Sequence, residues 1–149
     1  MHLEPLATVR VELAPGLDVG PTPGGRRRVF PIAGGSFTGR AFAGTVLPGG
    51  ADWQLVQPDG TAVIDTRYML RTGDGALVYI QTRGFRHGPP EILQRLAAGE
   101  PVDPAAYYFR LSLRFETAAP VYAWLARTIA VATARREPSA VVYDAYTLT

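Results

Sequence analysis

Apolar and polar residues alternate in steps of two along several short segments of the chain. The clearest segment is 108–117, which reads YFRLSLRFET. One of its faces carries apolar side chains and the other polar ones: Phe109, Leu111, Leu113 and Phe115 against Arg110, Ser112, Arg114 and Glu116. A period of two is that of a β-strand with one buried face. The segments 6–13, 62–71 and 76–83 share this period, and 124–134 and 140–148 are further candidates.

Glycine and proline separate these segments at short intervals. The chain holds 16 glycines and 13 prolines, and they cluster at 15–16, 21–25, 34–35, 48–50, 58–60 and 73–75. Proline presets φ and glycine tolerates positive φ, so each cluster predicts a turn. The last cluster lies between two predicted strands and indicates a tight hairpin. Only residues 89–99 suggest a helix, because two prolines open the segment, an apolar stripe follows and Gly99 ends it.

A sheet of many short antiparallel strands has edges that must be hidden, and closure into a barrel hides them. The length of 149 residues fits one domain, and a hydrophobic content of 47% is enough for a core. We therefore predict an all-β fold in which residues 1–149 form a single small antiparallel β-barrel with one short helix. Barrels of about eight strands are packed solid or hold one small ligand.

Composition excludes several classes of function. The chain has no cysteine, which excludes a disulfide scaffold and a thiolate nucleophile and fits a cytoplasmic protein. It shows no signal peptide and no apolar run long enough for a membrane helix, so no membrane partner is expected. No glycine-rich phosphate loop or histidine cluster is present, and no nucleotide or metal cofactor is predicted.

All cations are arginines, since the sequence lacks lysine, and the formal net charge is +2. The only basic cluster, residues 26–28, is interpreted as a solvated turn or strand edge. Nucleic-acid binding normally needs a broader basic face, so it is not expected.

The polar faces of the strands admit two interpretations. If the apolar face packs outside the barrel or against a second subunit, the polar face lines a pocket. If the apolar face fills the barrel, the polar face meets water, which is the usual arrangement in antiparallel sheets.

Three groups of residues favour a pocket. His87, between arginines in RGFRHGP, could serve as an acid or base, or it could cap the following helix. Asp65 and Arg67 share one strand face, where they could fix a substrate oxygen or form a surface ion pair. Asp52 beside Trp53 is a similar pairing, in which the indole could bind a planar ligand or be a rim residue.

The third group combines charge with aromatic side chains. It comprises residues 107–110, which read YYFR, then Arg114, Phe115 and Glu116, and then Tyr122 and Trp124. Pockets for aromatic or polyketide-like ligands have apolar walls and a few fixed polar groups. An aromatic girdle on a plain barrel, or a dimer contact, explains the same residues equally well.

The sequence resembles the proteins grouped as domain of unknown function 3237, and the resemblance covers nearly the whole chain. It rests on the motifs at 3–6, 19–20, 24, 27–28, 32–39, 46–53, 65–68, 114–117 and 122–125. The resemblance implies a calycin-like or allene-oxide-cyclase-like barrel that is often dimeric, with some relatives in biosynthetic settings. One departure is Ala126, where an asparagine is expected.

These observations lead to the hypothesis of a cofactor-independent cyclase, dehydratase or isomerase for an oxygenated aromatic or polyketide-like substrate. Asp52 or Asp65, alone or with His87, would be the general base, while Arg67 and Arg114 would stabilise an oxyanion. The predicted substrate-binding residues are Trp53, Tyr68, Phe115, Glu116, Tyr122 and Trp124. A non-catalytic carrier or sensor and a filled structural or partner-binding barrel are the alternatives. The expected assembly is a homodimer.

Overall fold

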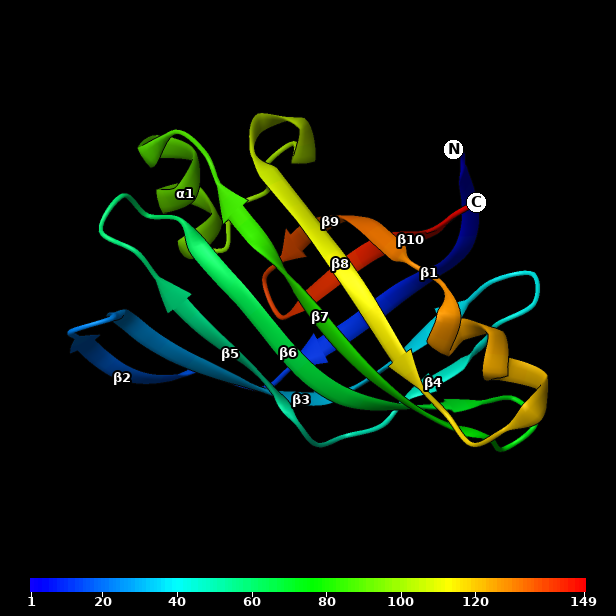
Figure 1. The fold of residues 1–149 in the computed structure, drawn as a ribbon. Coiled ribbons are helices and arrows are strands. Elements are labelled where there is room, and N and C mark those ends of the chain that lie inside the picture. The colour runs from blue at the N-terminus through cyan, green and yellow to red at the C-terminus, as the bar shows by residue number, and fades with distance from the viewer.

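The computed structural model describes residues 1–149 and consists almost entirely of β-strands that curve into a barrel (Figure 1). The strands are β1 (Leu3–Leu13), β2 (Leu17–Thr22), β3 (Gly25–Thr38), β4 (Gly44–Val46), β5 (Ala51–Val56), β6 (Ala62–Thr72), β7 (Leu77–His87), β8 (Tyr108–Glu116), β9 (Ala130–Glu137) and β10 (Ala140–Leu148). One α-helix, α1 (Pro90–Ala97), and two 3-10 helices, η1 (Pro104–Ala106) and η2 (Pro120–Arg127), complete the fold. None of the helices is long and apolar enough to cross a membrane.

All strand pairs are antiparallel, and the sheet closes because β1 pairs with both β10 and β3. Strands β4 and β5 each pair with β3 and β6, so they occupy one position that the loop between them interrupts. The barrel therefore has eight strand positions, and β2 is a hairpin extension of β3. This confirms the predicted small antiparallel barrel.

Most predicted elements are present, with two differences at their ends. The strand predicted at 76–83 continues to His87 as β7, which proves important for the site. The strand predicted at 124–134 is wrong in its first part, because residues 120–127 form η2 and β9 begins only at Ala130. Pro120 at the start of η2 favours a helical turn, and the run VYAWLAR has no period-two alternation.

Alternate residues of the strands fill the barrel with apolar side chains. In β8, Phe109, Leu111, Leu113 and Phe115 are buried, and the residues between them are exposed. The apolar face therefore points inward. In this strand the polar face meets water, which is the usual arrangement in antiparallel sheets. At one end of the barrel the Phe42 ring packs against the rings of Phe37, Phe115 and Tyr122 and plugs the interior.

The two ends of the barrel differ. Figure 1 shows α1 beside one end and the 3-10 turns that follow β8 near the other. Helix α1 has no buried residue, and it faces the barrel with the partly buried Ile92 and Leu96. The end beside α1 is the open one, and the candidate functional site lies there.

Candidate functional site

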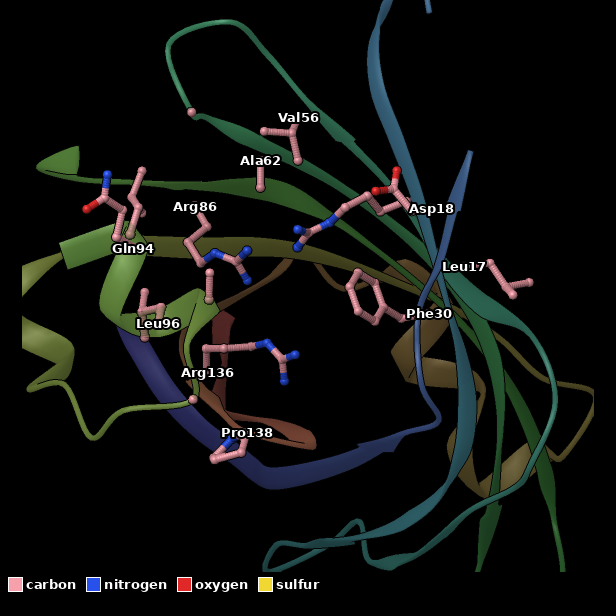
Figure 2. Close-up of a pocket in the computed structure, with 16 residues that line it drawn as sticks. Leu17, Asp18, Phe30, Val56, Ala62, Arg86, Gln94, Leu96, Arg136 and Pro138 are labelled. Atoms are coloured by element: carbon pink, nitrogen blue, oxygen red, sulfur yellow. The ribbon is translucent and has the colours of Figure 1, made fainter. Parts of the chain in front are cut away.

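A cavity of about 520 Å³ opens at the α1 end of the barrel. Its walls come from the mouth-facing ends of the strands and from α1, and Figure 2 shows Arg86, Arg136 and Phe30 pointing toward its centre. The same three side chains also line a smaller interior cavity of about 30 Å³, which continues down the barrel. The mouth is within the common size range of ligand sites, while the interior space is much smaller than a ring-bearing molecule.

Asp52 is the one carboxylate that lines the interior cavity. It lies on β5 opposite Phe30 of β3 and Thr66 of β6, and only 6% of the residue is exposed. The Gln54 amide nitrogen donates a hydrogen bond of 3.3 Å to Oδ2 of Asp52, whereas Oδ1 is buried without a partner. The carboxylate thus lines the interior cavity and keeps one buried oxygen for which the fold supplies no side-chain hydrogen bond.

Burial raises the pKa of Asp52 from 3.8 to about 6. The Asp65 backbone, the Arg86 and Arg136 charges and the Gln54 amide offset part of this effect. At neutral pH the group is still mostly ionised, and its pKa is close enough to neutrality for it to accept and return a proton. A raised pKa of this kind is typical of functional carboxylates, although buried structural groups also show it.

Three arginines reach the cavity from three strands: Arg28 on β3, Arg86 on β7 and Arg136 on β9. Burial and, after it, the like charge of Arg136 lower the pKa of Arg86 to about 10, although the charge of Asp52 acts in the opposite direction. Burial also lowers the pKa of Arg136, and the charge of Arg28 adds to that effect. The mouth is therefore a region of concentrated positive charge.

Below the charged groups, neutral hydroxyl groups of the inner wall pair with one another through hydrogen bonds. The hydroxyls of Tyr68 and Tyr143 lie 2.5 Å apart, and those of Thr66 and Thr82 lie 2.6 Å apart. Burial raises the pKa of both tyrosines, so they remain neutral at physiological pH. Tyr68 is thus an interior residue whose hydroxyl already has a partner.

Gly50 fixes the start of β5 and so the position of Asp52. Its φ is +71°, and a Cβ there would lie 2.0 Å from the backbone oxygen of Arg67. We expect Gly50→Ala to lower the free energy of unfolding by about 2–3 kcal/mol, because both strain and a backbone clash are introduced. Chemical denaturation measures this, with Gly73→Ala as the control, since Gly73 has open space around its Cβ position. Equal stability of the two variants would contradict the requirement for glycine at position 50.

Several sequence-predicted site residues do not line the cavity, because they occupy outward positions of their strands. Asp65 is half-buried on the outer face and accepts a hydrogen bond of 3.2 Å from Gln81, and Arg67 is exposed. Arg114 and Glu116 alternate with the buried residues of β8 and are exposed. The pocket interpretation of these four residues is therefore corrected.

The remaining predicted residues are scattered over the molecule. His87 is exposed and stacks on Tyr108 with ring centroids 4.8 Å apart, and it does not cap α1. Trp53 and Trp124 are 40% and 37% exposed, and neither lines the cavity. Tyr122 donates a hydrogen bond of 3.0 Å to Asp74. Phe115 is buried, at the plugged end of the barrel.

The sequence interpretation missed the three cavity arginines, although a signal for them exists. Arg86 has the parity of the buried Val78, Ile80 and Thr82 on β7, and Arg136 that of the buried alanines on β9. Arg28 was interpreted as part of a solvated cluster, but only its neighbours fit that description: Arg26 pairs with Asp18, and Arg27 donates to the Trp53 carbonyl. Extending each inward face to the end of its strand would have found all three.

A family model described as "Protein of unknown function (DUF3237)" matches residues 1–148. The chain belongs to this family. A UPF0311 protein of Bradyrhizobium diazoefficiens is 44% identical over 139 residues, which cover 93% of this chain and 91% of that protein. DUF3237 is therefore the family that the sequence motifs pointed to.

Solved structures agree with the barrel fold of this DUF3237 member. A β-barrel-like protein from Acinetobacter baumannii matches with a TM-score of 0.88 and 52% identity over 99% of this chain and 96% of that one. A protein from Penicillium herquei, described as an enzyme, matches with a TM-score of 0.75 and 20% identity over 99% of this chain and 94% of that one. At this identity the second match shows the shared fold alone.

Proposed function

We propose that this protein binds an oxygenated small molecule at the α1 end of the barrel and moves a proton on it with Asp52. The observation that carries the proposal is a buried carboxylate that lines the interior cavity adjoining the mouth, with one oxygen that has no hydrogen-bond partner and a pKa raised to about 6. The reaction class is a cyclisation, dehydration or isomerisation. The Penicillium herquei enzyme supports only the point that this fold is compatible with catalysis.

The proposed chemistry needs a base and a positive group for the charge that it creates. The Asp52 carboxylate accepts a proton from a hydroxyl or from a carbon next to a carbonyl, and it returns that proton to another atom of the same molecule. Arg86 is the charged side chain with the largest effect on the pKa of Asp52. It would stabilise the enolate or alkoxide oxygen that forms.

A carrier or sensor would use the same cavity without chemistry. A structural barrel with a purely apolar interior fits less well, because Asp52, Gln54 and Arg86 line the interior cavity. A cytoplasmic location and a homodimer are parts of the same proposal, and the absence of cysteine supports the first.

Deuterium exchange in D₂O tests the proposal without knowledge of the natural substrate. Wild-type protein is expected to exchange the α-protons of hydroxylated arylacetones, such as 4-hydroxyphenylacetone. The exchange rate should rise through pH 6 as Asp52 ionises. General base catalysis contributes about 10²- to 10⁴-fold, so Asp52→Asn should reduce the rate at least about 100-fold. Proton NMR measures both.

Asp65→Asn is the matched control, since it removes the same charge from the outer face of the neighbouring strand. It should exchange as wild type does. Ketones that bind, seen by line broadening, but do not exchange would favour the carrier. Exchange that survives in Asp52→Asn would remove Asp52 from the mechanism.

A further inference from the structure

Positive charge at the mouth exceeds what the chain itself neutralises. Arg28, Arg86 and Arg136 line the cavity, and Asp52 is the only carboxylate beneath them. Asp18 also reaches the rim, but it is engaged by Arg26, whose Nε lies 3.1 Å from Oδ2. Charges that are taken out of water without partners are unfavourable, so an anionic ligand would stabilise this cluster.

The arginines retain donors that the fold does not use. Nη2 of Arg28 donates a hydrogen bond of 3.2 Å to the Gln54 side-chain oxygen, while its Nε is buried with no acceptor. Arg136 donates through Nη1 to the backbone oxygens of Glu137 and Ala140, which fixes its guanidinium group. A buried N–H without an acceptor is rare in proteins, so the Arg28 guanidinium group is incompletely paired within the fold.

One aromatic ring holds two of these groups in place. The guanidinium carbons of Arg28 and Arg136 lie 5.3 and 5.8 Å from the centre of the Phe30 ring, within cation–π range. Figure 2 shows the Phe30 ring pointing into the cavity opposite Arg86 and Arg136. The donors are thus set before any ligand arrives, which lowers the entropic penalty of binding.

Apart from Asp18 and Gln94, the remaining residues of the mouth are apolar or glycine. Val56 of β5, Leu93 and Leu96 of α1, and Pro138 line it together with the arginines. A small inorganic anion would leave most of the 520 Å³ empty. A molecule with one charged end and an apolar body would contact both parts of the wall.

We propose that the mouth binds an organic carboxylate, with the carboxylate held by Arg28, Arg86 and Arg136 and the apolar body against α1. The two oxygens of a carboxylate match the planar fork of a guanidinium group. This inference deepens the proposed function, because it names the chemical class of molecule that the same cavity takes.

Calorimetric titration with 3-phenylpropanoate and its uncharged amide tests the charge requirement. Wild type should bind the acid at least about 10-fold more tightly than the amide, which corresponds to one favourable charge-assisted contact. Arg86→Gln and Arg28→Gln should each lose most of that preference. Arg83→Gln should keep it, because Arg83 is exposed on the outer face of the same strand as Arg86.

Equal binding of acid and amide by wild type, or no binding of the acid at millimolar concentration, would overturn the proposal. A preference that persists in both Arg86→Gln and Arg28→Gln would overturn it as well. If inorganic phosphate binds as tightly as the acid, the mouth is a simple anion site, and the apolar body of the ligand has no role in binding. Circular dichroism checks folding, and if Arg86→Gln is unfolded, Arg28→Gln decides.

Proton uptake gives a second, independent measurement. The negative charge of a bound carboxylate would raise the pKa of Asp52 further. Binding near pH 7 should therefore draw a proton from the buffer. The other ionisable groups around these two cavities are Asp18, Arg28, Arg86, Arg136, Tyr68 and Tyr143. Titration in buffers of different ionisation enthalpy should show uptake of up to one proton in wild type and none in Asp52→Asn.

These measurements separate the two proposals. Acid binding without deuterium exchange would keep the carboxylate site and favour the carrier. Exchange on neutral ketones without a preference for the acid over its amide would keep Asp52 as a base and overturn the carboxylate site.

Discussion

Phe109→Ala is expected to lower the free energy of unfolding by about 3–5 kcal/mol, which is the usual range for removing a buried aromatic ring. Phe109 is 2% exposed and belongs to the main core cluster. It also lines the interior cavity, where its ring lies 5.6 Å from the guanidinium carbon of Arg86. The variant therefore loses apolar burial and a contact that supports the mouth.

Urea denaturation of wild type and the variant measures the loss. At roughly 2–4 °C per kcal/mol for a domain of this size, the melting temperature should fall by about 10 °C. Phe85→Ala is the matched control, since Phe85 is 52% exposed on β7 and pairs with Arg110 in the register. Its effect should stay below about 1 kcal/mol. A similar loss in both variants would contradict the inward direction of the apolar face.

The alternation in β8 shows what the sequence could and could not predict. Period two identified the strand and separated Phe109 and Phe115 from Arg114 and Glu116. Which of the two faces points inward depends on what the other strands place opposite, and one strand does not contain that information. The apolar face fills the barrel, so the cavity lies at its mouth and is not formed by the polar faces.

The charged cluster was harder to predict because its members are far apart in the sequence. Asp52 lies beside the β3 residues of the cavity only because β5 pairs with β3, and Arg136 joins them only when β1 closes the barrel between β10 and β3. Local patterns predict hairpins, whereas these long-range pairs depend on the whole sheet. Asp52 was predicted on the motif around Trp53, which itself lies on the outer face.

The open and plugged ends of the barrel make different use of aromatic and charged residues. At the plugged end, Phe42 and its ring partners fill the space that a ligand would need. At the open end, Phe30 supports guanidinium groups beside empty volume. Buried charge with incomplete partners reduces stability, and proteins retain such groups mainly where function needs them.

Asp52→Asn is expected to make the protein more stable at neutral pH while removing its proposed base. The pKa of Asp52 is about 6 in the fold and is raised from its ordinary value of 3.8 mainly by burial. Each pH unit between the two values is worth about 1.4 kcal/mol, so the ionised form destabilises the fold by about 3 kcal/mol. Asparagine has nearly the shape of the protonated side chain and avoids this penalty.

The sign of the pH dependence follows from proton binding. Below pH 3.8 the group is protonated in the folded and the unfolded chain and contributes no difference. Between 3.8 and 6 the folded chain holds a proton that the unfolded chain has released, so this contribution to stability falls as the pH rises. Above pH 6 the destabilisation is complete. The advantage of Asp52→Asn should therefore be about 3 kcal/mol at pH 7.5 and disappear near pH 4.

Urea denaturation of wild type, Asp52→Asn and Asp65→Asn between pH 4 and pH 7.5 measures this dependence. The difference between wild type and each variant is the informative quantity, because the other carboxylates titrate equally in all three. Asp65→Asn should show no gain at pH 7.5, since Asp65 is only half-buried and already accepts a hydrogen bond from Gln81. If Asp52→Asn is destabilised at pH 7.5, the Asp52 carboxylate is a structural partner of the arginines, and the charge at the mouth needs no ligand to be neutralised.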